Sequence, residues 1–325
     1  MEPYDVIIVG AGIAGLVAAR ELQGAGLRTV VLEKSRGFGG RMATRRVGSA
    51  VFDHGAQFFT ARDPRFAALV RSMEAAGVST RWFGGDETAT HERHRGVPSM
   101  TAPCNWLAGG LDVRGSSQVA RVRVGEDSDL EVELEGGVLL LTQRVVLTAP
   151  VPQSLALCRA GALPLEPGLV EALESVHYEP TFALMAVLDA PAAGLSAAGF
   201  VEPGGDGALV WIADNRLKGT SPDATALTLH ASHAFSRKHF DDPTDQVARC
   251  LLEAATPWIR GNVIESSLHR WRYAAPVRCL DSLCLGSERA PVLFAGDAFG
   301  GAKVEGAALS GWAAAERVLW SLSLR

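Results

Sequence analysis

The sequence has little of what a secreted, membrane-spanning or nucleic-acid-binding protein would carry. It contains 5 cysteines and 3 tyrosines, and its formal net charge is −5. The cysteines are odd in number, scattered and without a Cys-x-x-Cys pair. They predict neither a disulfide framework nor a metal site, and they favour a reducing, cytoplasmic location. The small net charge provides no basic field for nucleic acid.

Long hydrophobic runs are also missing. The longest apolar tract, residues 182–201, is interrupted by Asp189, Pro191 and glycine, whereas a spanning helix needs about 20 consecutive apolar residues. The N-terminus lacks the basic region that opens a secretory signal. We therefore expect no membrane association. A chain of 325 residues has room for about two domains and a sizeable core.

Glycine, by contrast, is abundant, with 35 residues, and its first cluster lies in a dinucleotide-binding pattern. Residues 6–9 form a continuous β-branched run, which predicts a strand buried in a parallel sheet. Gly-Ala-Gly-Ile-Ala-Gly follows at 10–15, then a helical pattern over 16–22 and a second buried strand over 29–32. This βαβ unit carries the G-x-G-x-x-G signature.

Each glycine of this signature has a physical role. Gly10 permits the tight turn, Gly12 lets the backbone approach a pyrophosphate, and Gly15 lets the helix pack closely on the sheet. Glu33, at the end of the second strand, is placed to accept both hydroxyls of an adenosine ribose, and its charge would repel a 2′-phosphate. The unit predicts FAD or NAD rather than NADP, bound by Gly10, Gly12, Ile13, Ala14, Gly15 and Glu33.

A second glycine-rich loop follows Glu33 so soon that it favours FAD over NAD. Such a loop suits a long cofactor whose diphosphate and isoalloxazine lie beyond the adenosine. Arg41 could give planar bidentate hydrogen bonds to the diphosphate, and the alternative is a solvated basic loop. The predicted contacts in this loop are Lys34, Gly39, Gly40, Arg41 and Met42.

The C-terminal end carries a matching pattern. Residues 291–298 predict a buried strand that ends in Gly296 and Asp297. This strand places a carboxylate at the sheet edge where α/β folds bind ligands. Residues 304–311 open a last helix rich in small residues, which can approach a flat ring. The positive end of its dipole would favour negative charge there.

Together these segments resemble the FAD-binding oxidoreductases that include the flavin amine oxidases. The resemblance rests on residues 10–15, Glu33, residues 39–41 and residues 291–298. It implies bound FAD, with Asp297 accepting from a ribityl hydroxyl. Because Cys279 and Cys284 lie upstream of Gly296, we expect the FAD to be non-covalent. The helix residues implied at the flavin are Val304, Glu305, Gly306 and Ala307.

Within that superfamily the sequence most resembles renalase and its bacterial relatives. The similarity is carried by residues 34–42, 53–62, 215–216, 229–231 and 269–274 and by the C-terminal end. The segment 53–57 is the most specific part. Gly55 and Ala56 are small enough to pass beside a flavin ring, and Gln57 can point an amide at a ring edge or a substrate. An ordinary buried amide is the alternative for Gln57.

The fold that follows is α/β, with a discontinuous Rossmann-type FAD-binding domain and a second α+β substrate domain on a mostly antiparallel sheet. We place the FAD domain in residues 1–60, 105–160 and 265–325, and the substrate domain in 61–104 and 161–264. The resemblance implies that Val119 touches the adenine and that Thr148 ends a strand returning to the first sheet. Predicted strands of that sheet include 118–124, 130–134, 138–141 and 144–150. Those of the second sheet are 182–188, 209–213 and 226–231, followed by a helix over 243–256.

Substrate contacts are expected from the second sheet and from the segment that leads back to the first. The candidates are Gln57, Trp211, Asn215, His230, His269 and Trp271. The histidines could equally be satisfied core residues, and the tryptophans core or cavity wall. The sequence shows no Ser/His/Asp order, metal-ligand spacing or Walker lysine, so no catalytic residue is assigned and the chemistry falls to the flavin.

The resemblance implies a specific reaction. Renalase-like enzymes oxidise isomers of reduced nicotinamide nucleotides, of the 2-dihydro-NAD(P) type, to NAD(P)⁺ by hydride transfer to flavin N5, and O₂ becomes H₂O₂. The partners are therefore a small-molecule substrate and O₂. Two alternatives stay open: a flavin amine oxidase or desaturase acting on an amine or hydrophobic substrate, and an FAD-binding module without turnover.

Overall fold

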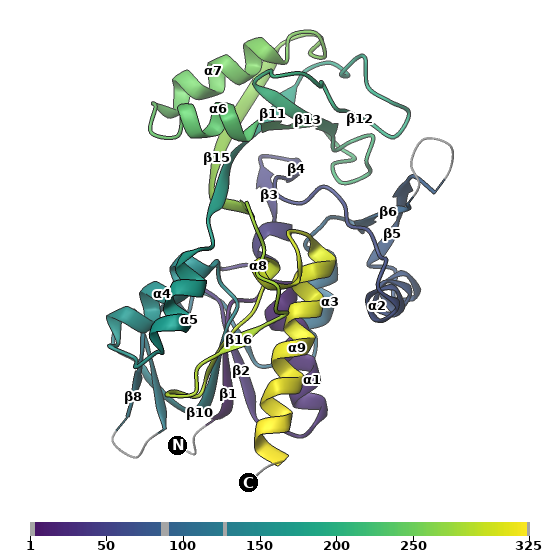
Figure 1. The fold of residues 1–325 in the computed structure, drawn as a ribbon. Coiled ribbons are helices and arrows are strands. Elements are labelled where there is room, and N and C mark those ends of the chain that lie inside the picture. The colour runs from purple at the N-terminus through teal and green to yellow at the C-terminus, as the bar shows by residue number, and fades with distance from the viewer. Residues whose placement is uncertain (1–3, 86–90, 126–128, 324–325) are drawn as a thin grey trace.

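The computed structural model describes residues 4–85, 91–125 and 129–323. Its two large sheets lie one in the lower and one in the upper half of Figure 1, and two two-stranded hairpins accompany them. The central strands of the lower sheet are β17 (Val292–Phe294), β10 (Leu139–Leu147), β1 (Tyr4–Val9) and β2 (Thr29–Leu32), in that order and parallel. The edge strands are β16 (Leu285–Gly286) and β7 (Val113–Arg114).

The register of these strands brings their carboxyl ends together. Val9 on β1 pairs with Leu32 on β2 and with Leu147 on β10, and Leu147 pairs with Phe294 on β17. Segments far apart in the sequence therefore end at one edge of the sheet, as the C-terminal Gly-Asp pattern predicts. Ligands bind at this edge in open α/β sheets.

Helices cover both faces of the lower sheet. On one face lie α1 (Ile13–Gly24), α3 (Ala102–Ala108) and the final helix α9 (Val304–Ser323), and on the other α4 (Val151–Ala160) and α5 (Pro167–Glu174). Because the strands are buried on both faces, their sequences are continuous apolar runs. Helix α9 packs so closely on α1 that a side chain at Gly311 would lie 2.2 Å from the carbonyl oxygen of Ala14.

One predicted pair of strands is a single strand. Residues 138–141 and 144–150 were predicted as separate segments, but β10 runs continuously from Leu139 to Leu147. Thr142, in the predicted gap, is fully buried, and its hydroxyl donates to the carbonyl of Arg144. The first half of β10 pairs with β9 (Leu130–Leu134), which in turn pairs with β8 (Val119–Val124).

The upper sheet is antiparallel throughout its described strands. Its order is β12 (Phe200–Val201), β13 (Leu209–Asp214), β14 (Thr225–Ala231), β11 (Tyr178–Leu188) and β15 (Val263–Pro276). Helices α6 (His233–Lys238) and α7 (Thr244–Ala254) cover its outer face. The predicted strands of this sheet and the helix over 243–256 are confirmed.

Two hairpins accompany the upper sheet. The hairpin of β3 (Thr44–Val47) and β4 (Ala50–Asp53) lies between the sheets in Figure 1, and that of β5 (Ser79–Phe83) and β6 (Arg93–Gly96) lies to one side. Helix α2 (Pro64–Ala75) packs its buried side chains against α1 and α9, in the core of the lower half. The short elements η1 (Gly40–Met42) and α8 (Asp297–Gly300) complete the described chain.

Strand β15 crosses a predicted domain boundary. Residues from 265 onward were assigned to the FAD domain, but β15 pairs with β11 in the upper sheet as far as Pro276. The other domain limits remain predictions. No helix in the described ranges is both long and apolar enough to cross a bilayer.

Candidate cofactor and active site

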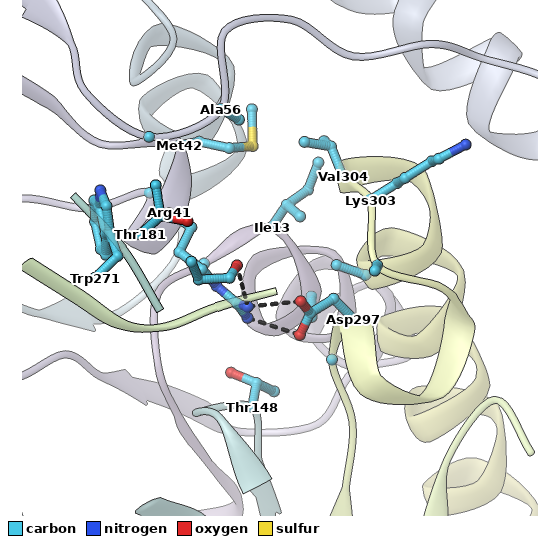
Figure 2. Close-up of a pocket in the computed structure, with 18 of the residues that line it drawn as sticks. Ile13, Arg41, Met42, Ala56, Thr148, Thr181, Trp271, Asp297, Lys303 and Val304 are labelled. Carbon is cyan, nitrogen blue, oxygen red and sulfur yellow. Dashed lines mark hydrogen bonds and ion pairs between the residues drawn. The ribbon is translucent and has the colours of Figure 1, made fainter. Parts of the chain in front are cut away.

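A cavity of about 290 Å³ lies where the carboxyl edge of the lower sheet meets the upper sheet. Figure 2 shows part of its wall, with Ile13 and Val304 from helix starts near Asp297, and with Thr181 and Trp271 from the upper sheet. Of the predicted residues, the cavity is lined by Gly12, Ile13, Ala14, Gly39, Arg41, Met42, Gly55, Ala56, Thr148, His230, Trp271, Gly296, Asp297, Val304 and Ala307.

In the first glycine loop, Gly15 has a packing role and Gly12 a ligand-binding role. A side chain at Gly15 would lie 2.1 Å from the carbonyl oxygen of Gly10, so Gly15 allows α1 to begin directly against the loop. A side chain at Gly12 would meet no protein atom within 4 Å. Gly12 lines the cavity beside the start of α1, where the first helical N–H groups have no intrahelical acceptor. This open space suits a phosphate group.

Arg41 and Asp297 form a bidentate ion pair in the cavity wall. Arg41 Nη1 and Nη2 donate to the two carboxylate oxygens of Asp297 at 2.6 and 2.7 Å, and Arg41 also donates to the carbonyl of Ala274 at 3.3 Å (Figure 2). The pair joins η1 to the end of β17. A guanidinium has five donors and a carboxylate about four acceptor positions, so both groups keep capacity for a ligand.

Glu33 occupies a buried position directly after β2. Its carboxylate accepts from the backbone N–H of Ala11 at 2.9 Å and of Ser35 at 2.8 Å, and only 7% of the residue is exposed. The two bonds fix the carboxylate beside the glycine loop and leave acceptor positions for hydroxyl groups. Other predicted cofactor contacts outside the cavity wall are Gly10, Gly15, Lys34, Gly40, Gln57, Val119, Glu305 and Gly306.

Two of these residues hold elements together. Glu305 Oε1 accepts from the backbone N–H groups of Arg62 and Asp63 at 2.6 and 2.7 Å, which ties the start of α9 to the segment before α2. A side chain at Gly306 would lie 2.4 Å from the carbonyl oxygen of Gly300. Both contacts shape the turn between α8 and α9 that borders the cavity.

Three neighbouring histidines are uncharged at neutral pH. His54 and His230 line the cavity, and the ring of His269 lies 5.0 Å from that of His54. Burial, with added repulsion from His269 and Arg45, lowers the pKa of His54 to about 3. Burial lowers the pKa of His230 to about 4 and also lowers the pKa of His269.

The His54 backbone and Trp271 connect the lower and upper parts of the wall. Trp271 Nε1 donates to the carbonyl of His54 at 2.9 Å, and His230 donates to the same oxygen from Nε2 at 3.2 Å. The rings of His54 and Trp271 stack with centroids 5.1 Å apart. In this part of the wall the cavity is lined by the uncharged rings of His54 and His230 and by the indole of Trp271.

The chain matches two family profiles. Residues 8–73 match the NAD(P)-binding Rossmann-like domain, and residues 95–319 match the flavin-containing amine oxidoreductases. The chain belongs to the flavin-containing amine oxidoreductase family. This family consists of flavin-containing oxidoreductases.

Curated proteins are similar to this chain over short segments. Lysine-specific histone demethylase 1 homolog 1 of Arabidopsis thaliana is 53% identical over 47 residues, which is 14% of this chain and 6% of that protein. Putrescine oxidase of Kocuria rosea is 42% identical over 69 residues, 21% of this chain and 14% of that protein. The chain thus matches less than a sixth of the length of these curated relatives.

Structural similarity covers nearly the whole chain. The structure of a triple mutant of putrescine oxidase, made to redesign its cofactor binding, aligns with 98% of this chain and 99% of that one. The TM-score is 0.72 and the sequences are 16% identical, so the likeness establishes the common fold.

The residues of this family member fit FAD. The open space at Gly12 would take the diphosphate, and the Glu33 carboxylate would bind the ribose of the adenosine. The small wall residues around Ala56 and Ala307 would lie against the flat ring. The chemistry that bound FAD supplies is acceptance of a hydride at N5 and transfer of the electrons onward.

Several predicted substrate residues lie away from the cavity wall. Asn215 is fully buried and bonded through both ends of its amide, to Asp53 N and to Ala226 O and Thr228 Oγ1. Trp211 stacks on Phe200 with centroids 4.7 Å apart, in an aromatic cluster. His269 and Gln57 are not among the lining residues, although the His269 ring lies 5.0 Å from that of His54. Gln57 donates within its own turn, while its Oε1 is buried without a protein partner.

Some wall residues were not predicted. His54, Thr181, Ala274, Ala302 and Lys303 also line the cavity. His54 lies inside the segment 53–57, and its place between Asp53 and the small pair Gly55 and Ala56 was an available signal. Thr181 and Ala274 come from strands of the upper sheet, and nothing local in the sequence marks them as wall residues.

Proposed function

We propose that this flavin enzyme oxidises isomeric dihydronicotinamide nucleotides, which carry their hydride at the wrong ring carbon, to NAD(P)⁺. Overall, the dihydronucleotide, O₂ and one proton give NAD(P)⁺ and H₂O₂. The resemblance to renalase-like proteins supports this substrate class. The proposal also includes non-covalent FAD and a cytoplasmic location.

The observation that carries the proposal is the charge of the cavity wall. Asp297 is the one carboxylate among the described wall residues, and it is already paired with Arg41. The wall histidines His54 and His230 are uncharged, and Lys303 adds a positive charge. A cationic amine would find no free carboxylate here, whereas an anionic nucleotide would meet no repulsion.

The neutral histidines also suit an activated substrate. A dihydropyridine becomes aromatic when it loses a hydride, so the protein does not have to remove a proton from it first. Trp271 would give the ring a flat surface to stack on, and the bonds from Trp271 and His230 to the His54 carbonyl would hold that surface in place. The protein's task is to orient the substrate and exclude water.

An amine oxidase is the competing function. The family name and the similarity to putrescine oxidase favour it. Against it stands the lack of an unpaired carboxylate among the described wall residues. We therefore treat amine oxidation as the outcome that would displace the proposal.

The test is aerobic turnover of the FAD-loaded protein with a panel of donors. We expect H₂O₂ and NAD⁺ in equal amounts from 2-dihydro-NAD, and little H₂O₂ from ordinary NADH, putrescine or a monoamine. Trp271→Ala should lower kcat/KM for the dihydronucleotide at least about tenfold, since a lost aromatic contact and its burial are worth more than about 1.4 kcal/mol. Trp320→Ala, at a position 64% exposed on α9, is the matched control. Faster H₂O₂ production from an amine would overturn the proposal.

A further inference from the structure

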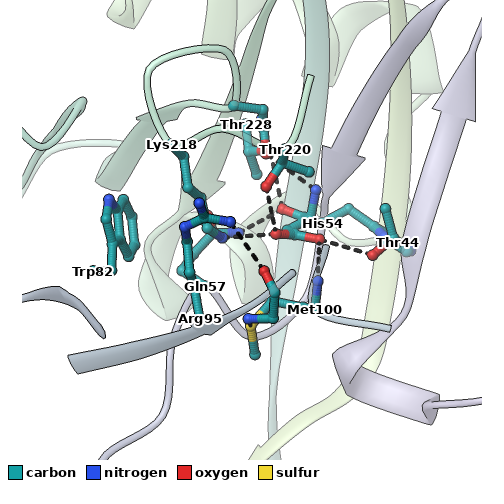
Figure 3. Close-up of polar contacts among 12 residues, drawn as sticks. Thr44, His54, Gln57, Trp82, Arg95, Met100, Lys218, Thr220 and Thr228 are labelled. Carbon is teal, nitrogen blue, oxygen red and sulfur yellow. Dashed lines mark hydrogen bonds and ion pairs between the residues drawn. The ribbon is translucent and has the colours of Figure 1, made fainter. Parts of the chain in front are cut away.

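A fully buried ion pair lies behind the cavity wall. Lys218, which follows β13, places Nζ 2.8 Å from Oδ2 of Asp53 at the end of β4, and both side chains have 0% exposure (Figure 3). Neither residue lines the cavity. Burying two charges costs desolvation energy that their attraction need not recover, so a buried pair is weak evidence for a stabilising role. Its partners indicate a different role.

The carboxylate of Asp53 is saturated with donors. Oδ1 accepts from Thr44 Oγ1 at 2.7 Å and from the backbone N–H of Met100 at 2.9 Å. Oδ2 accepts from Lys218 and from Thr220 Oγ1 at 3.2 Å. One side chain thus joins the β3–β4 hairpin, the segment before α3 and the loop after β13, as Figure 3 shows.

The backbone of Asp53 is fixed as well. Its N–H donates to Asn215 Oδ1 at 3.1 Å, and its carbonyl accepts from Thr228 Oγ1 at 3.0 Å and from Gln57 Nε2. Gln57 also donates to the carbonyl of Gly55 at 3.2 Å, which closes the turn over residues 53–57. Asp53 therefore determines where this turn begins.

The turn that starts at Asp53 forms part of the cavity wall. His54, Gly55 and Ala56 all line the cavity. The backbone N–H of Ala56 donates to the carbonyl of Arg41 at 2.8 Å, and a side chain at Gly55 would lie 2.0 Å from that oxygen. Residues 54–56 therefore pack directly against the loop that carries Arg41, without free space between them. A displacement of Asp53 would move these wall residues.

We propose that Lys218 is a positioning residue, which acts through Asp53 to set the place of the wall residues 54–56 beside the bound flavin. Lys218 lies in the loop that follows β13 of the upper sheet. This loop would in this way fix the position of residues beside a cofactor bound at the edge of the lower sheet. The inference rests on FAD occupying the cavity and is independent of the proposed substrate.

The test compares three forms of the FAD-loaded full chain: wild type, Lys218→Met and the double variant Asp53→Asn with Lys218→Met. The first variant removes the hydrogen-bonded counter-charge of the buried Asp53 carboxylate, which keeps only the weaker attraction of the half-buried Arg95, and should lower the thermal midpoint. The double variant removes both charges and should recover most of that loss. In the double variant, however, an NH₂ group replaces the oxygen of residue 53 that accepts from Thr220. The hydrogen bonds that hold the turn over 53–57 therefore differ from those of the wild type. We expect the absorption maxima and the reduction potential of the bound FAD to be shifted in both variants.

The matched control removes an ion pair far from the cavity. Arg123 and Glu131 pair between β8 and β9, and Arg123→Met with Glu131→Gln should leave the flavin spectrum and potential as in wild type. A double Asp53–Lys218 variant with a wild-type spectrum and potential would overturn the proposal, because the pair would then be structural only. The proposal would also be overturned if neither Lys218 variant yielded folded, FAD-containing protein. The ion pair would then be required for folding of the whole chain.

Discussion

Glu33 ends β2 with its carboxylate held by the backbone N–H groups of Ala11 and Ser35. We expect Glu33→Gln to weaken FAD binding at least about tenfold, because hydrogen bonds to a charged group are worth about 1.5–3 kcal/mol. The amide offers one acceptor oxygen in place of two. Titration of the apoprotein with FAD, followed by flavin fluorescence, measures the dissociation constant.

Glu21→Gln provides the control for this change. Glu21 lies on α1, close to the same loop in sequence, and its side chain is 38% exposed and paired with Arg65. Its replacement should leave the FAD dissociation constant unchanged. Equal affinities for wild type and Glu33→Gln would contradict the assignment of Glu33 to the adenosine ribose.

The buried histidines predict how stability changes with pH. The pKa values of His54 and His230 fall from 6.5 in the unfolded chain to about 3 and about 4 in the folded protein. Below pH 6.5 the unfolded chain therefore binds more protons than the folded one, and the free energy of unfolding decreases as the pH falls toward 4. Each histidine contributes up to about 1.4 kcal/mol per pH unit in this window.

Urea unfolding at pH 7, 6 and 5 measures this dependence. His230→Asn should reduce the loss of unfolding free energy between pH 6 and pH 5, even if it lowers stability at pH 7. His177→Asn, at an exposed position, is the control that should keep the wild-type slope. An unchanged slope in His230→Asn would show that His230 is not kept neutral by burial.

The glycine loop between β1 and α1 provides a test at the level of one element. A methyl group at Gly15 would collide with the Gly10 carbonyl, so Gly15→Ala should cost about 1–3 kcal/mol of stability. Gly12 has φ −77° and ψ 175°, values open to any residue, and free space around it. Gly12→Ala should therefore fold normally and bind FAD at least about tenfold more weakly.

Thermal unfolding of the apoprotein and FAD titration separate the two effects. Gly24→Ala, at the other end of α1 and also without neighbours within 4 Å, should change neither. Loss of apoprotein stability in Gly12→Ala, with unaltered FAD affinity, would reverse the roles assigned to Gly12 and Gly15.

Elements with a strong local pattern were predictable from the sequence. Strands β1, β2 and β17 are short apolar runs that end at glycine or a carboxylate, and α9 begins after a glycine-rich turn. Strand β15 was not predicted, because most of its residues are half-buried or exposed and its 14 residues show no clean alternation. Its partner β11 lies about 80 residues earlier, and only that pairing makes it a strand.

The same limit applies to the site. Loop residues such as Gly12, Arg41 and Asp297 belong to compact motifs, and all three line the cavity. Asp53 and Lys218 are 165 positions apart, and neither flanking sequence shows that they will meet. Thr181 likewise reaches the wall only because β11 crosses above the lower sheet.

At the scale of the whole molecule, function depends on the meeting of two sheets. The lower sheet supplies the loops that fit the diphosphate and ribose, and the upper sheet supplies His230, Trp271 and Thr181 above them (Figure 1, Figure 2). The hairpin β3–β4 and the turn after it connect the two. A cofactor bound in the cavity would thus be enclosed by segments from both ends and the middle of the chain.

We propose that this enzyme oxidises a dihydronicotinamide ring rather than an amine. The most direct measurement is the rate at which flavin absorbance near 450 nm is lost after anaerobic mixing of the holoenzyme with each donor in a stopped-flow instrument. We expect 2-dihydro-NAD to bleach the flavin far faster than NADH, putrescine or a monoamine does at the same concentration. Bleaching by an amine at an equal or higher rate would contradict it.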